Sequence, residues 1–281
     1  MIRIIIDSAC DMPKTKADEL HLDFLPLKTI FGEEEFLDGI NISHEEFYKK
    51  LESSKVNPTT SQVSPADYEE VYEDVKKCGD TAIVITLSSK LSGTYQSANI
   101  ARDGYEDCVY IVDSENVTLG EQVLILYACQ LRDKGCSAEE IVAALEEKKK
   151  EICVVAVLDT LEYLQRGGRI SKTVAVAGNL LSIKPVIAVV DGEVALIGKA
   201  RGMKNGYAQL TQAVKDRGGI DFSMPSAYVY SGLTDDHLQK YIKEVANTWE
   251  DQIEEIPIYS IGSTIGTHVG PGALGVIFFH K

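Results

Sequence analysis

The sequence predicts a two-domain α/β protein, with an N-terminal doubly wound, mainly parallel sheet and a C-terminal α+β domain whose sheet is mixed or antiparallel. In the first half, apolar runs rich in β-branched residues alternate with helical patterns, which is typical of parallel strands covered on both faces. The second half instead has a strong hairpin signal, Asp191-Gly192, between two apolar runs. We therefore expect one domain over residues 1–155 and a second over residues 156–281.

Four apolar runs are predicted as strands of the first sheet, and all of them end in polar residues. They are "IRIIIDS" (2–8), "TAIVITLSS" (81–89), "CVYIVDS" (108–114) and "CVVAVLDT" (153–160). In a parallel α/β sheet, ligands bind beyond the carboxyl ends of the strands. The polar strand ends are therefore expected to lie at a ligand site.

Helices are predicted between these strands from their start signals and apolar periodicity. Ser43 and Glu46 have the spacing of a capping box, Ser137 and Glu140 repeat it, and Pro65 suits a first helical turn. The three predicted helices cover residues 43–53, 64–77 and 137–151.

The second half combines strands and helices in a different order. We expect a hairpin over residues 184–201, a strand over 226–233 and a final strand over 272–279. Residues 235–249 have one apolar face at helical spacing, so they are predicted to form an amphipathic helix.

Composition excludes several classes of function. The formal net charge of −15 disfavours a nucleic-acid-binding surface. The six cysteines form no CxxC pair and no secretory signal precedes them, so we expect reduced thiols in a cytoplasmic protein. The longest apolar region, 174–190, is interrupted by polar residues and predicts a helix followed by a strand rather than a transmembrane segment. No spacing suggests a metal site, and we expect no metal or other cofactor.

Two hydroxyl-rich segments are candidate site elements. Thr59, Thr60 and Ser61 precede a predicted helix, where they either cap it or help to bind an anion. The segment "SSKLSGTYQSA" (88–98) follows a strand and leads into a helix that is predicted to begin near Ser92 or Gly93. It has neither the GxSxG pattern of a hydrolase nor a Gly-rich phosphate motif, so helix capping stays open as an alternative.

His268 and two basic segments complete the candidates. His268 is predicted to lie in a Gly-rich loop, "IGSTIGTHVGPGALG" (261–275), whose glycines allow the backbone to approach a ligand closely. Basic residues gather in "QRGGRISK" (165–172) and "GKARGMKNG" (198–206). These segments are either ordinary surface charge or a docking patch for a partner or its anionic ligand.

Several of these motifs together resemble those of the DegV family of bacterial proteins. They occur in one order along nearly the whole chain: "DSACDMP" (7–13), "TTSQVSP" (59–65), "LSSKLSGTYQSA" (87–98), "VDSENVTLG" (112–120), "LDTLEYLQRGGRISK" (158–172), "LLSIKPV" (180–186) and "IGTHVGPGALG" (265–275). The resemblance implies a two-domain α/β fold with a long-chain fatty acid bound between the domains.

The resemblance also implies a carrier function. Family members resemble the fatty-acid-binding subunit of bacterial fatty acid kinase, which presents the carboxylate of its lipid to a separate kinase subunit for phosphorylation to acyl phosphate. On this basis the ligand is a long-chain fatty acid, and the chain has no catalytic residue of its own. Transient contact with a membrane surface is compatible with such a lipid cargo.

Residue roles follow from the matching motifs. The carboxylate-binding residues of the family match Thr60, Ser92 and His268. The surrounding head-group region of the family matches Ser61, Gly93, Thr94 and Arg169.

The basic segment implicated in kinase contact matches Arg201 and Lys204. Two departures from the family pattern stand out. Residues 8–10, "SAC", replace a more hydroxyl-rich opening, and Met203 stands where a second basic residue is common. The first departure leaves the head-group motifs intact, whereas the second bears on partner docking.

An enzyme is the alternative that the residues themselves leave open. In an acyl hydrolase or transferase, Ser92 would be the nucleophile and His268 the base. The missing elbow motif and the lack of an evident residue to orient His268 count against this alternative. A nucleotide- or phosphate-binding sensor ranks below it, because no Gly-rich phosphate motif is present.

Overall fold

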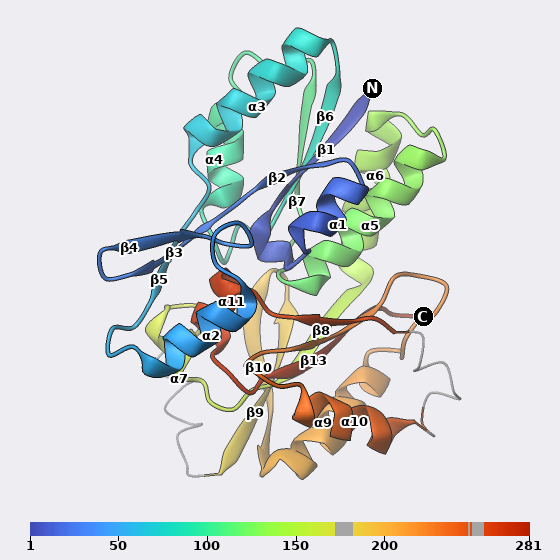
Figure 1. The fold of residues 1–281 in the computed structure, drawn as a ribbon. Coiled ribbons are helices and arrows are strands. Elements are labelled where there is room, and N and C mark those ends of the chain that lie inside the picture. The colour runs from blue at the N-terminus through green and yellow to red at the C-terminus, as the bar shows by residue number, and fades with distance from the viewer. Residues whose placement is uncertain (172–181, 247, 249–255) are drawn as a thin grey trace.

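The computed structural model describes residues 1–171, 182–246, 248 and 256–281. Within these residues the chain forms a four-stranded, a six-stranded and a three-stranded sheet. Figure 1 shows the four-stranded sheet with its helices at one end of the molecule and the six-stranded sheet at the other.

The four-stranded sheet is fully parallel, in the order β2-β1-β6-β7. Its strands are β1 (Ile2–Asp7), β2 (Leu22–Leu25), β6 (Thr81–Thr86) and β7 (Val109–Asp113). Helices α3 and α4 lie on one face, and α1, α5 and α6 lie on the other (Figure 1). Their bounds are α1 (Lys14–Glu19), α3 (Pro65–Cys78), α4 (Thr94–Ala101), α5 (Leu119–Asp133) and α6 (Ala138–Lys148). The predicted doubly wound, parallel sheet is confirmed.

The predicted helix starts are confirmed at the level of their caps. Helix α2 (His44–Ser53) begins with a capping box formed by Ser43 and Glu46, and α6 begins with a second one formed by Ser137 and Glu140. Helix α3 has Pro65 in its first turn, as predicted. These helix starts could be predicted from the sequence because each capping residue lies within three residues of its partner.

The six-stranded sheet is mixed, in the order β10-β9-β8-β13-β11-β12, and only its β11–β12 pair is parallel. Its strands are β8 (Ile152–Val157), β9 (Ile183–Val190), β10 (Glu193–Arg201), β11 (Ala227–Tyr230), β12 (Ile258–Ser260) and β13 (Leu274–Phe279). Helices α9 (Met203–Asp216) and α10 (Asp236–Val245) pack on it. The predicted hairpin is confirmed, since β9 and β10 meet at Asp191 and Gly192, which have φ of 49° and 80°.

The placement of the run 153–160 in the first sheet is wrong. It forms β8, which pairs antiparallel with β13 and β9 at the centre of the second sheet. A continuous apolar run identifies a strand that is covered on both faces, but not the sheet to which that strand belongs. The predicted limit between residues 155 and 156 therefore falls inside β8. The division into two domains stays a prediction, and the sheet assignment favours a limit just before Ile152.

The three-stranded sheet was not predicted. It consists of β3 (Lys28–Phe31), β4 (Glu34–Leu37) and β5 (Thr59–Ser61), paired antiparallel in the order β4-β3-β5. The expectation that Thr59–Ser61 caps a helix is wrong, because these residues pair with β3 and Ser64 caps α3 instead. Three residues are too few to show the alternation of a strand.

Two predicted elements extend beyond the described residues. The helix expected in the first part of 174–190 falls mostly on residues 172–181, and the end of the helix expected over 235–249 falls on residues that are also left out. The strand that was expected after the first of these helices is confirmed as β9.

The carboxyl end of β1 holds a buried acid, Asp7. Its side chain is fully buried and accepts hydrogen bonds from the backbone N–H of Ala9 and of Leu87, each at 2.9 Å. These bonds connect the ends of β1 and β6. Burial raises the pKa of Asp7 to about 7, although both hydrogen bonds act in the opposite direction.

Asp7 should make the stability of the protein depend on pH. Because its pKa is raised in the folded state, that state binds more protons than the unfolded chain between about pH 4 and pH 7, so stability falls as the pH rises through this window. Asp7 alone should lower the free energy of unfolding by roughly 2–3 kcal/mol between pH 5 and pH 8. The free energy of unfolding, measured by urea titration at several pH values, should depend less on pH in Asp7→Asn than in the wild type. An equal pH dependence in the two proteins would contradict the raised pKa of Asp7.

Candidate functional site

A cavity of about 310 Å³ lies between the two larger sheets and takes its wall from both halves of the chain. Its apolar lining consists of Leu27, Leu87, Leu91, Val117, Leu164, Val194, Ile265 and Val269. Its polar lining consists of Thr60, Ser61, Gln62, Ser92, Arg169, Thr264 and His268, with Gly93 beside Ser92. The cavity wall therefore combines apolar side chains with hydroxyl, amide, imidazole and guanidinium groups.

An open groove adjoins the cavity. It is lined by residues 89–93, 168–171 and 193–196, and it shares Leu91, Ser92, Gly93, Arg169 and Val194 with the cavity. Ser92 and Arg169 thus lie where the cavity meets the groove.

His268 lies on a helix, not in the predicted loop. Helix α11 (Ser263–Val269) ends at Gly270, whose φ is 70°, so the glycines bound a short helix. His268 is half-buried, and its Nε2 lies 2.9 Å from the hydroxyl of Thr60 on β5. A Cβ on Gly167 would lie 2.1 Å from Nδ1 of His268, so a glycine is required beside the ring.

His268 is neutral at pH 7. Burial, together with the positive charge of Arg169, lowers its pKa from 6.5 to about 4. Its Nδ1 is buried and has no hydrogen-bond partner in the described part of the chain. The ring is therefore an uncharged hydrogen-bonding group and not a cation.

Ser92 is held by the start of the helix that follows it. Its Oγ accepts a hydrogen bond from the backbone N–H of Thr94 at 3.2 Å and lies 2.9 Å from the hydroxyl of Thr94. Helix α4 begins at Thr94 with Gly93 as its N-cap, close to the predicted position. A Cβ on Gly93 would lie 2.0 Å from Oε1 of Gln62, so a larger residue there would require the side chain of Gln62 to move.

Arg169 supplies the positive charge of the site. It lies just beyond α7 (Glu162–Arg166), and its Nε and Nη1 donate to the backbone carbonyls of Leu91 and Gly167 at 3.0 and 2.6 Å. No carboxylate among the described residues forms an ion pair with it. Burial lowers its pKa, but a guanidinium stays protonated in proteins. The charge is thus available to an anionic ligand.

The structure brings together most, but not all, of the residues singled out from the sequence. Those that line the cavity are Thr60, Ser61, Ser92, Gly93, Arg169 and His268. Thr94 is fully buried behind Ser92 and supports it. Sequence reasoning missed Gln62 and Thr264; Gln62 completes the "TTSQ" motif, and Thr264 lies one helical turn before His268.

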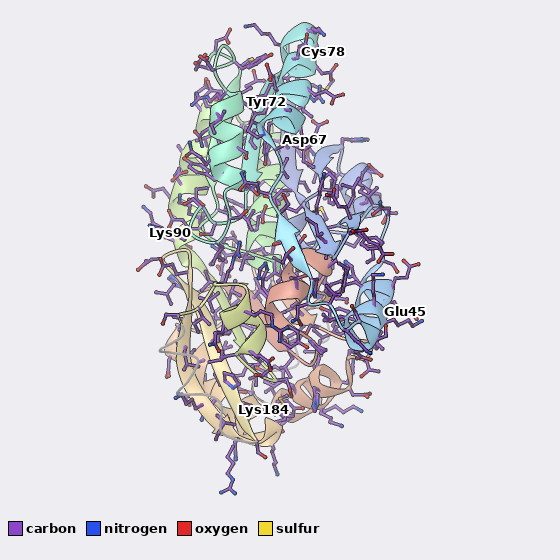
Figure 2. The ribbon with its side chains drawn as sticks, turned by 90° about the vertical axis from the view of Figure 1, so that its left-hand side faces the viewer. Glu45, Asp67, Tyr72, Cys78, Lys90 and Lys184 are labelled. Atoms are coloured by element: carbon purple, nitrogen blue, oxygen red, sulfur yellow. The ribbon has the colours of Figure 1, made fainter. Side chains whose placement is uncertain are left out.

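Arg201 and Lys204 do not line the cavity. Arg201 ends β10 seven residues after Val194, which corresponds to roughly 23 Å along a strand. Figure 2 shows Lys90 near the tip of the β9–β10 hairpin, whereas Lys184, which is paired with Ala200, is at its far end. Arg201 and Lys204 are exposed there, so any role of theirs concerns another surface.

The arrangement does not form a nucleophile–base pair. His268 Nε2 is bonded to Thr60 rather than to Ser92, and its Nδ1 has no carboxylate to orient it within the part of the chain described. Across the same residues, no group of three or more His, Cys, Asp and Glu side chains is placed to hold a metal ion. None of the helices described is long and apolar enough to cross a membrane.

The fold and the cavity define a class: α/β proteins in which two large sheets flank a cavity with both apolar and polar groups in its wall. Comparison with known proteins then identifies the family. The family model described as "Uncharacterised protein, DegV family" matches residues 1–281, so the chain belongs to the DegV family.

Relatives and solved structures agree over the full length. The chain is 38% identical to a DegV domain-containing protein of Caldanaerobacter subterraneus, covering 100% of this chain and 99% of that protein. It matches a DegV family protein from Thermus thermophilus, described as binding fatty acid, with a TM-score of 0.90 and 31% identity over 100% of this chain and 99% of the other. It also matches DegV from Bacillus subtilis, described as a fatty acid binding protein, with a TM-score of 0.84 and 30% identity over the same shares.

The low pKa of His268 has two causes that a substitution can separate. In Arg169→Gln, loss of the nearby positive charge should raise the pKa of His268, but burial is the larger cause and should keep it below 6.5. NMR titration of the ring carbon signals would measure both values. An unchanged pKa in the variant, or one restored fully to 6.5, would contradict the stated causes.

Proposed function

We propose that this protein binds a long-chain fatty acid in the cavity, with the carboxylate at Thr60, Ser92 and His268 and near Arg169. The observation that carries the proposal is the distribution of polarity: eight apolar side chains line the cavity together with hydroxyls, a neutral imidazole and a guanidinium that has no ion pair among the described residues, and Ser92 and Arg169 lie where the cavity meets the open groove. A fatty acid has the matching distribution. The fatty acid binding described for the Thermus and Bacillus proteins supports the same ligand class.

The energetics assign different roles to the two ends of the ligand. Burying about sixteen carbons at about 0.8 kcal/mol each is worth on the order of 10 kcal/mol before the costs of association. A hydrogen bond to a charged head group adds only about 1.5–3 kcal/mol. The apolar wall should therefore dominate affinity, whereas Thr60, Ser92, His268 and Arg169 determine where the carboxylate lies.

We further propose that the protein is a cytoplasmic carrier that presents the carboxylate to a separate kinase subunit, which forms the acyl phosphate. Ser92 and Arg169 adjoin the open groove, so the head group is the accessible end of the ligand. Arg201 and Lys204 are exposed and are our candidates for partner contact. The carrier needs no catalytic residue or cofactor of its own, and it would exchange its lipid by transient contact with a membrane surface.

A serine-dependent acyl hydrolase or transferase remains the alternative, with Ser92 and His268 in the roles of nucleophile and base. The hydrogen bond of His268 to Thr60 counts against it. The alternative predicts a covalent adduct at Ser92 with activated esters, which Ser92→Ala would abolish.

The function is tested by identifying the bound lipid. Mass spectrometry of an organic extract of the purified protein should detect a long-chain fatty acid, and the delipidated protein should take up palmitate or oleate. In Ser92→Ala, affinity for the acid should fall by about 10-fold to 100-fold, the value of a hydrogen bond to a charged group, while the lipid is still detected. Absence of lipid together with absence of uptake would exclude the proposal.

The partner surface is tested separately. Arg201→Glu should reduce acyl phosphate formation in the presence of the kinase subunit, with the lipid content unchanged, because Arg201 lies outside the cavity. Lys215→Glu, an equally exposed charge reversal in the last turn of α9, is the matched control and should have no effect. Equal activity of both variants and the wild type would exclude Arg201 from the contact.

A further inference from the structure

The helix that carries His268 is held at its start by acids from the other half of the chain. The backbone N–H of Gly262 donates to Asp11 at 2.8 Å. The backbone N–H and the hydroxyl of Ser263 both donate to Oδ1 of Asp38, at 2.9 and 2.7 Å. Asp11 follows β1 and Asp38 follows β4, whereas α11 precedes the last strand (Figure 1).

This junction is buried and tightly fitted. Asp11, Asp38 and Ser263 are 3%, 2% and 1% exposed. A Cβ on Gly262 would lie 2.9 Å from Asp11, 3.1 Å from Asp38 and 3.1 Å from His44, so the position suits only glycine. Hydrogen bonds that a carboxylate accepts from the first amides of a helix satisfy donors that have no partner inside the helix.

The same junction reaches the strand that carries Thr60. The hydroxyl of Ser263 lies 2.9 Å from that of Thr29 on β3, and Thr29 is paired with Thr60 across β3 and β5. Five residues along α11, about 7.5 Å, separate Ser263 from His268, which meets the hydroxyl of Thr60. Contacts thus run from Ser263 through Thr29 and Thr60 to His268, and the helix itself connects His268 back to Ser263. Asp38 holds Ser263, so the start of the helix determines where its end lies.

We propose that Asp38, supported by Asp11, is a positioning residue for carboxylate recognition: it holds α11 against β3 so that His268 meets Thr60 at the head-group end of the cavity. This inference rests on the proposed function. Asp38 does not line the cavity, so it would act on the ligand only through the helix. Its effect should therefore appear in the recognition of the head group and not in the burial of the tail.

The test compares an acid with an alcohol of the same length. Dodecanoic acid and dodecan-1-ol share the tail but differ in the head group, so the ratio of their dissociation constants isolates carboxylate recognition. Titration calorimetry with delipidated wild-type protein should give tighter binding of the acid. Asp38→Ala should lower this preference by about 10-fold, with alcohol affinity unchanged within about twofold.

Two variants separate positioning from general stability. Asp38→Asn keeps an oxygen that accepts from Ser263, and Oδ2 of Asp38 has no partner among the described residues, so this variant should retain most of the preference. Asp7→Ala removes another fully buried acid that accepts two backbone amides, but from its own half of the chain. It should lower stability and leave the preference for the acid unchanged.

A spectroscopic readout covers the case in which Asp38→Ala does not fold. Ser263→Ala removes the hydroxyl bonds to Asp38 and Thr29 but keeps the backbone amide. This variant should lower the preference for the acid over the alcohol by about threefold, and it should shift the ring NMR signals of His268.

The possible results are distinct. An unchanged ratio of dissociation constants in folded Asp38→Ala, or an unchanged ratio and unshifted ring signals in Ser263→Ala, would overturn the positioning role and leave the proposed function standing. A wild-type protein that binds neither compound and takes up neither palmitate nor oleate would overturn the proposed function. One that binds the acid and the alcohol equally would overturn the head-group assignment, and the positioning role fails in both cases.

Discussion

The structure depends on hydrogen-bond acceptors for the first backbone amides of α11, which lie in a buried junction. The helix approaches from the end of the chain, while the carboxylates of Asp11 and Asp38 approach from its first forty residues. A buried amide without a partner costs about 1–3 kcal/mol. The two halves of the protein must therefore meet at this junction for α11 to be stable, and the cavity wall that α11 provides exists only in that assembled state.

The parts of the fold that follow from short-range patterns were predictable. The parallel strands, the capping boxes and the Asp191-Gly192 hairpin each depend on residues close together in sequence. The membership of β8 in the second sheet was not predictable, because its partner β13 lies more than a hundred residues away. Strand β5 and helix α11 were missed since three residues show no alternation and a Gly-rich segment has poor helix propensity.

The candidate site, like the fold, could be predicted from the sequence only in part. Motifs pointed to Thr60, Ser92, His268 and Arg169, and all four line one cavity. Nothing in their spacing indicates that Thr60 bonds to His268, because the two are 208 residues apart. The role of Asp38 could not be predicted from the sequence, because acidic residues are common in this chain. Only its burial and its hydrogen bond with Ser263 distinguish it from the others.

The central position of β13 in its sheet has a consequence for biosynthesis. On one side β13 pairs with β8 and on the other with β11, although it follows all the other described strands in the sequence. The parallel sheet of the first half can form during translation, since its strands are complete by Asp113. The six-stranded sheet cannot be completed before β13 has been made, and α11 directly precedes β13 in the chain. A nascent chain that lacks α11 and β13 is therefore without part of the cavity wall, because α11 contributes Thr264, Ile265, His268 and Val269 to that wall.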